Sequence, residues 1–77
     1  MVKAYIFIKC MAGDFEPVKK QIQAIPEITS CTRLMEAFDF VCTIEVQNSK
    51  MLRPIVTSKI RTIPEVIETM TIICVSP

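Results

Sequence analysis

The sequence contains no histidine and only one glycine, Gly13. Without histidine, the chain lacks the side chain that most often acts as a general base near neutral pH. One glycine is too few for a phosphate-cradling loop, and the sequence has no nucleophile elbow or obvious pair of carboxylates. These absences argue against catalysis, so we expect a protein that is not an enzyme and that carries no cofactor.

Metal ligands and signal sequences are also scarce. The chain has four cysteines, none of them in a CxxC pair: Cys10, Cys31, Cys42 and Cys74. Without CxxC or histidine, a zinc site has little support, and we expect no metal. Two disulfides in a secreted protein fit the cysteine count, but the apolar run 4–8 is too short for a signal peptide, and Lys9 interrupts it. We therefore expect a cytoplasmic protein whose free cysteines pack as small apolar side chains.

Long apolar runs and blocks of like charge are absent too. No run approaches the roughly 20 residues that span a bilayer. Nine basic and eight acidic residues are scattered along the chain, for a net charge of +1. We expect neither membrane insertion nor direct nucleic-acid binding. The 77 residues suffice for one domain, 1–77, and their 51% apolar content favours association, because so short a chain buries little core alone.

The sequence does contain an internal repeat. Residues 24–28, AIPEI, return 38 positions later as residues 62–66, TIPEV. The same offset aligns Ile6 with Ile44 and Ile22 with Ile60. The repeat predicts that each half of the chain is one strand-helix-strand unit.

The first half begins with a predicted strand, Val2 to Cys10, rich in β-branched and aromatic residues. Asp14 is a suitable N-cap for a helix that Pro26 ends, with Pro17 tolerated in its first turn. The apolar stripe of this helix comprises Phe15, Val18, Ile22 and Ile25. Residues 28–35 and 38–46 then form two strands, joined at Glu36 and Ala37.

The second half repeats this pattern. Asn48 or Ser49 caps a helix that Pro64 closes, and Pro54 should weaken or kink its first turn. The apolar stripe of this helix comprises Leu52, Ile55, Val56, Ile60 and Ile63. Residues 66–75 form the last strand. The order βαββαβ, with right-handed crossovers, predicts a ferredoxin-like α+β fold: a four-stranded antiparallel sheet in the order 4-1-3-2 with both helices on one face.

Alternation along the strands divides the sheet into two faces. We expect the helices to cover one set of residues: Ala4, Ile6, Ile8, Cys10, Phe40, Cys42, Ile44, Val46, Met70, Ile72 and Cys74. The other face is left uncovered, and its apolar residues are a candidate dimer interface: Tyr5, Phe7, Met35, Val41, Ile73 and Val75. Its polar residues are expected to be Cys31, Arg33, Asp39, Thr43, Glu45, Thr69 and Thr71. Because an exposed apolar patch usually marks an interface, we expect a face-to-face dimer.

Few polar residues stand out as candidate ligand contacts. Asp39 lies beside the hairpin in an otherwise apolar stretch. It either bonds nearby backbone or offers a carboxylate to a ligand ammonium at a subunit boundary. Thr69 and Thr71 either fill a strand as β-branched residues or line a small polar pocket. Glu27 and Glu65 are interpreted as solvated turn residues after the two helices.

Several motifs together resemble a known family. They are Val2-Lys3-Ala4-Tyr5 in the first strand, the twice-used helix-Ile-Pro-x-Ile/Val-strand step, Phe38-Asp39 after the hairpin, and Thr69-x-Thr71 in the last strand. In order and spacing, the whole chain resembles the effector-binding RAM domain of the leucine-responsive regulator/AsnC (Lrp/AsnC) family of prokaryotic transcription regulators. That family usually has glycine where this chain has Glu27, Glu65 and, at the hairpin, Glu36. The helix-turn-helix has no counterpart here, so the resemblance is to a stand-alone module.

The resemblance implies a dimeric α/β barrel, assembled further into a ring such as a tetramer of dimers. It also implies an amino acid or related metabolite bound between dimers, near Phe38, Asp39, Thr69 and Thr71. The leading hypothesis is therefore an amino-acid-sensing oligomerisation module in transcription regulation that acts on full-length Lrp/AsnC regulators. Two alternatives are an assembly module without a ligand and a small dimeric α/β-barrel enzyme, for which Tyr5, Arg33 and Asp39 would be the available polar groups.

Overall fold

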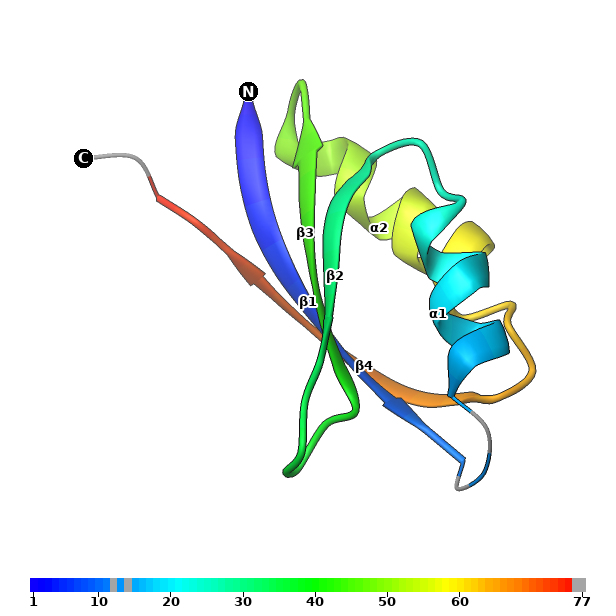
Figure 1. Ribbon diagram of the computed structural model, residues 1–77. Helices are drawn as coiled ribbons and strands as arrows, with labels where there is room; N and C mark the ends of the chain where they lie inside the picture. The colour runs from blue at the N-terminus through cyan, green and yellow to red at the C-terminus, as the bar shows by residue number, and fades with distance from the viewer. Residues whose placement is uncertain (12, 14, 76–77) are drawn as a thin grey trace.

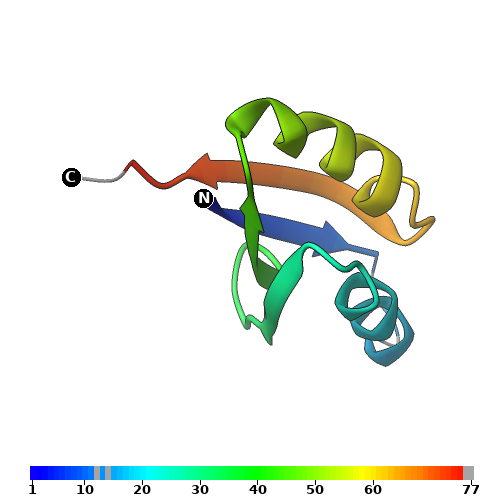
Figure 2. The same ribbon diagram turned by 90° about the horizontal axis from the view of Figure 1, so that it is seen from above.

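One four-stranded antiparallel sheet organises the chain, and both helical segments lie on the same face of it (Figures 1 and 2). The computed structural model describes residues 1–11, 13 and 15–75. The strands are β1 (Val2–Cys10), β2 (Ile28–Arg33), β3 (Phe40–Val46) and β4 (Val66–Ile73). Their order across the sheet is β2-β3-β1-β4. This is the predicted order 4-1-3-2 read from the opposite edge, so the ferredoxin-like fold is confirmed.

The first helix, α1 (Glu16–Gln23), is shorter than the segment 15–25 over which the predicted apolar stripe extends. Pro17 lies in its first turn, where the missing N–H needs no partner. The predicted cap at Asp14 lies outside the described residues, and Phe15 precedes the helix without a side-chain capping bond. Val18 and Ile22 are buried against the sheet, which confirms the predicted stripe.

The second helix is composite. It comprises a 3₁₀ turn η1 (Ser49–Met51), a short α2 (Leu52–Ile55) and a wider π segment η2 (Val56–Ile60). The side chain of Asn48 caps it by accepting a 3.1 Å hydrogen bond from the Lys50 N–H, which settles the predicted choice of cap. Pro54 cannot donate to a preceding carbonyl, and the first turn is 3₁₀ rather than α, as expected for a weakened start.

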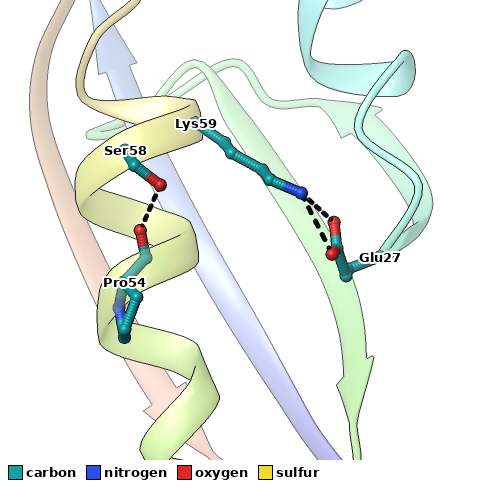
Figure 3. Close-up of polar contacts among 4 residues, drawn as sticks. All are labelled: Glu27, Pro54, Ser58 and Lys59. Carbon is teal, nitrogen blue, oxygen red and sulfur yellow. Dashed lines mark hydrogen bonds and ion pairs between the residues drawn. The ribbon is translucent and has the colours of Figure 1, made fainter.

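An ion pair joins the second helix to the start of β2 (Figure 3). The Lys59 ammonium donates to both carboxylate oxygens of Glu27, each at 3.0 Å. This hydrogen bonding lowers the pKa of Glu27. On the same helix, the Ser58 hydroxyl donates to the carbonyl of Pro54 at 2.6 Å. Glu27 is therefore a paired residue rather than a merely solvated one, although the exposed pair contributes little to stability.

The core lies between the sheet and the helices. It contains the predicted residues of β1, β3 and both helical stripes: Ala4, Ile6, Ile8, Cys10, Val18, Ile22, Ile25, Phe40, Cys42, Ile44, Val46, Leu52, Ile55, Val56, Ile60 and Ile63. Phe15, which immediately precedes α1, also packs against this cluster. The apolar periodicity of these segments therefore identified the core correctly.

A β-bulge near the start of each outer strand changes which side chains face the helices. In β2, Ile28 pairs with Ile44 and Ser30 with Thr43, so Thr29 is an extra residue. In β4, the pairing skips Ile67 in the same way. Thr29 and Ile67 are 38 positions apart, so the repeat includes the bulge. Residues beyond each bulge therefore lie on the face opposite to the one that simple alternation predicts.

Because of the bulges, the residues that follow them in β2 and β4 lie on the face opposite to the predicted one. Directly opposite residues of an antiparallel pair project from the same face. Thr69, Thr71 and Ile73 pair with Ile8, Ile6 and Ala4, so they lie on the helix face. Met70 and Ile72, predicted to lie beneath the helices, pair with Phe7 and Tyr5 on the open face. Cys31 and Arg33 likewise move to the helix face, opposite Cys42 and Phe40.

The open face consequently differs from the predicted interface. Tyr5, Phe7 and Val41 lie on it as expected, whereas Ile73 lies on the other face. Met35 belongs to the hairpin loop and is 99% exposed, and Val75 follows the end of β4. The apolar open face, as the structure shows it, consists of Tyr5, Phe7, Phe38, Val41, Met70 and Ile72. Cys74 was predicted to lie beneath the helices. Its amide donates to the carbonyl of Lys3, an open-face residue, so the β1–β4 pairing continues one residue past Ile73 and Cys74 belongs to the open face.

Asp39 ends the pairing between β1 and β3. The connection between β2 and β3 is six residues long, 34–39, rather than the predicted two, and Ala37 has a left-handed φ of 53°. The Asp39 amide donates to the carbonyl of Ile8 at 2.8 Å, and its carboxylate accepts a 2.7 Å bond from the amide of Cys10. The side chain thus replaces the carbonyl that β3 would offer if it continued, which supports the backbone-bonding interpretation of Asp39.

We predict that Asp39→Ala destabilises the fold by about 1–3 kcal/mol, because it leaves the Cys10 N–H without an acceptor. Asp39→Asn keeps an acceptor oxygen and should cost less. Glu36→Ala, in the exposed part of the same loop, is the matched control and should stay within about 0.5 kcal/mol of the parent. Urea denaturation at constant protein concentration measures all three. Equal stability of Asp39→Ala and Glu36→Ala would rule out this role.

Candidate functional site

A groove runs between the second helix and β4 on the helix face of the sheet. Its volume is about 350 Å³. Residues of both elements line it: Ser49, Leu52, Arg53, Val56, Thr57, Arg61, Thr69, Thr71 and Ile73. β4 is an edge strand with β1 on only one side, so the groove opens at the margin of the sheet.

Helix and strand geometry place the polar groups of the groove in two rows. Ser49, Arg53, Thr57 and Arg61 are spaced four residues apart, which aligns them along one side of the second helix. Thr69 and Thr71 are two apart in β4 and therefore share one face. The apolar residues of the groove are Leu52 and Val56, which belong to the core, and Ile73, which continues the β4 row and is 46% exposed.

The charge of the groove is positive. Arg53 and Arg61 are exposed, and within the described part of the chain their guanidinium groups form no ion pair. A guanidinium presents a planar fork of donors that matches a carboxylate. Threonine hydroxyls both donate and accept, so they suit an ammonium or a further carboxylate oxygen. The groove therefore has the chemistry to hold a small zwitterion with an apolar side chain.

The four candidate ligand residues fall into two separate pairs. Thr69 and Thr71 lie together in the groove, on the β4 side of β1. Phe38 and Asp39 lie on the β3 side of β1, at the hairpin. Phe38 packs its ring against Phe7 on the open face, with ring centroids 5.7 Å apart. Within one subunit the structure thus brings the threonines together but does not bring Phe38 and Asp39 to them.

Sequence reasoning missed the helical contribution to this groove. Ser49, Arg53, Thr57 and Arg61 received no functional interpretation, although their regular spacing of four residues beside an apolar stripe was visible. Arg33, predicted on the open face, instead lies over the ring of Phe15 at 3.7 Å.

Residues 1–11, 13 and 15–75 contain no cluster of three or more cysteine or carboxylate side chains that could hold a metal ion. The helices of this part of the chain are too short to cross a membrane.

Comparison with known proteins identifies the family. The family model for the Lrp/AsnC ligand binding domain matches residues 3–77. Among solved structures, FFRP-DM1 is 31% identical, with a TM-score of 0.90, and the match covers 97% of this chain and 100% of that one. A search of curated proteins gives no match.

Two longer regulators share the fold. Escherichia coli AsnC is 19% identical, with a TM-score of 0.90, and the match covers 99% of this chain and 52% of that one. A transcriptional regulator from Neisseria meningitidis, solved in complex with L-Met, is 13% identical, with a TM-score of 0.82, and the match covers 97% and 50%. The chain spans about half of each regulator. The family model and the fold together show that the chain belongs to the Lrp/AsnC ligand-binding domain family.

Proposed function

We propose that the protein is a non-enzymatic module that senses amino acids and assembles through its open face to influence transcription regulators. Membership of a ligand-binding domain family of transcription regulators supports a regulatory sensing role. The observation that carries the ligand assignment is the groove, which joins Thr69 and Thr71 to two arginines that form no ion pair with any described residue. The family also supports a cytoplasmic location and full-length Lrp/AsnC regulators as partners.

The positions of the charged and hydroxyl groups define the proposed orientation of the ligand. The carboxylate lies against Arg53 or Arg61, and the ammonium lies near the hydroxyls of Thr69 and Thr71. An apolar ligand side chain contacts Leu52 and Val56. The Neisseria meningitidis relative, crystallised with L-Met, is a precedent for such a ligand on this fold. Phe38 and Asp39 join the site only if another subunit brings its hairpin to the groove, as expected for a ligand that binds between dimers.

The open face supports self-association. Tyr5, Met70 and Ile72 are 36%, 43% and 47% exposed, and Phe7 and Val41 lie beside them. The charged residues Lys3, Glu45, Lys9 and Glu68 flank these apolar residues along the strands. An apolar centre with a charged rim is typical of a protein interface. We propose a symmetric dimer in which two open faces pack together, with rings of dimers as the larger assembly.

A second function, assembly without a ligand, is favoured by one observation. Phe38 and the Asp39 carboxylate, two of the four candidate ligand residues, are already engaged with Phe7 and the Cys10 amide. Under this alternative, association with full-length regulators needs only the open face.

We predict that the wild-type chain is a dimer at micromolar concentration, measured by light scattering after size exclusion. Ile72→Lys places a charge among the apolar residues of the open face and should raise the dissociation constant at least about tenfold, since burying an unpaired charge is costly. Met51→Lys, on the second helix and 39% exposed, is the control and should remain dimeric. A monomeric wild type, or a dimer unaffected by Ile72→Lys, would contradict the proposed interface.

We predict that at least one common amino acid raises the melting temperature of the protein. At 100 times its dissociation constant, a ligand stabilises the native state by about 2.7 kcal/mol. Arg61→Gln and Thr71→Val should each weaken binding about tenfold or more, whereas Lys50→Gln, a cation outside the groove, should not. If no amino acid shifts the melting temperature at millimolar concentration while the chain still dimerises, the ligand-free alternative holds.

A further inference from the structure

Two cysteines meet across the pair of strands farthest from the groove. Cys31 in β2 lies directly opposite Cys42 in β3. The Cys42 thiol donates to the Cys31 sulfur, with the two sulfur atoms 3.5 Å apart. Both thiols are free. Their contact is a product of the β2 bulge, because without Thr29 as the extra residue Cys31 would project from the open face.

The register already satisfies the main geometric requirement for a disulfide. Opposite residues of an antiparallel pair have Cα atoms about 4.5–5.5 Å apart. Disulfides span Cα separations of about 4.4–6.8 Å. The register therefore places the two Cα atoms within the range that a disulfide spans, and the two sulfurs are already in contact.

The surroundings give the two thiols different roles. Cys31 belongs to the edge strand β2 and packs against the core only in part, so part of the residue remains exposed to solvent. The hydrogen bond from Cys42 and the nearby charge of Lys19 lower the pKa of Cys31, which favours its thiolate. Cys42 is fully buried, and its contact with Cys31 together with burial raises the pKa of its thiol. Cys31 is thus the attacking sulfur and Cys42 the resolving one.

We propose that Cys31 and Cys42 form a thiol–disulfide exchange site for small-molecule disulfides such as glutathione disulfide. The Cys31 thiolate attacks one sulfur of the substrate, breaks its S–S bond and releases one glutathione thiolate. Cys42 then loses its proton and attacks the Cys31 sulfur, which releases the second glutathione thiolate. The two cysteines are oxidised by two electrons, and one glutathione disulfide is reduced to two glutathione molecules.

The exchange site lies at the base of the hairpin that carries Phe38 and Asp39. Oxidation joins β2 to β3 on either side of loop 34–39. The disulfide would therefore join the two ends of the hairpin loop. In this loop, Phe38 packs on the open face and Asp39 bonds to the end of β1. The exchange chemistry itself needs neither the groove nor the dimer, so it can be tested separately from amino-acid binding.

The test is incubation of the native chain with glutathione disulfide, followed by alkylation of free thiols and peptide mapping. Trypsin cleaves after Lys20, Arg33 and Lys50, so Cys31 and Cys42 fall on separate peptides, 21–33 and 34–50. We expect a disulfide between these two peptides and release of two glutathione molecules per chain. Dithiothreitol should restore both thiols.

Three variants separate the roles. Cys31→Ser should abolish the product, and Cys42→Ala should stop at a mixed disulfide between glutathione and Cys31. Cys74→Ser, which removes a partly buried cysteine near the opposite edge, should react like wild type. Circular dichroism verifies folding, and if Cys42→Ala does not fold, the wild-type map and Cys31→Ser decide. Unreacted Cys31, or faster modification of Cys10 or Cys74, would overturn the proposal.

Discussion

Two β-bulges, one in each outer strand, determine which side chains the helices cover. Each inserts a single residue, Thr29 in β2 and Ile67 in β4, after a residue that still pairs with the core. Because side chains alternate along a strand, one inserted residue reverses the face of every residue that follows. The bulges therefore leave Met70 and Ile72 on the open face and place Thr69 and Thr71 beneath the second helix. The apolar open face, the groove and the thiol pair all depend on this reversal.

The groove combines the bulge with the irregular second helix. β4 contributes two threonines that would otherwise point away from the helices. The helix contributes a polar row, Ser49, Arg53, Thr57 and Arg61, beside its buried stripe. A π segment is wider than an α-helix and is frequent near functional sites. The positive charge of the groove comes entirely from the helix, whereas its hydroxyl groups come from both elements.

Much of the fold was predictable because its signals are local. Apolar periodicity identified both helical stripes and the inner residues of β1 and β3, and Pro17, Pro26 and Pro64 indicated where the helices begin and end. The bulges have no such signal, since neither carries a glycine and each is defined only by pairing with the neighbouring strand. The errors in the predicted faces within β2 and β4 follow from that omission, whereas Met35 and Val75 were misplaced because these strands end earlier than predicted.

The candidate site was predicted only in part, for the same physical reason. Thr69 and Thr71 were identified from the sequence, but on the wrong face, so the arginines opposite them were missed. The sequence left two interpretations of Asp39 open, and the structure shows the backbone-bonding one, because a carboxylate beside a turn commonly accepts such a bond. The Cys31–Cys42 contact could not be foreseen, since simple alternation places these two sulfurs on opposite faces of the sheet.

The arrangement keeps three kinds of interaction apart. The proposed self-association uses the open face, the groove opens beside β4, and the thiol pair lies between β2 and β3 on the helix face. Since the groove and the thiols are both on the face that a dimer leaves exposed, neither is covered when two open faces pack together. The hairpin contacts two of these regions, through Phe38 on the open face and through the β2–β3 pair at its base. Under the two proposals, a disulfide between Cys31 and Cys42 would constrain the hairpin that carries Phe38 to the proposed dimer interface.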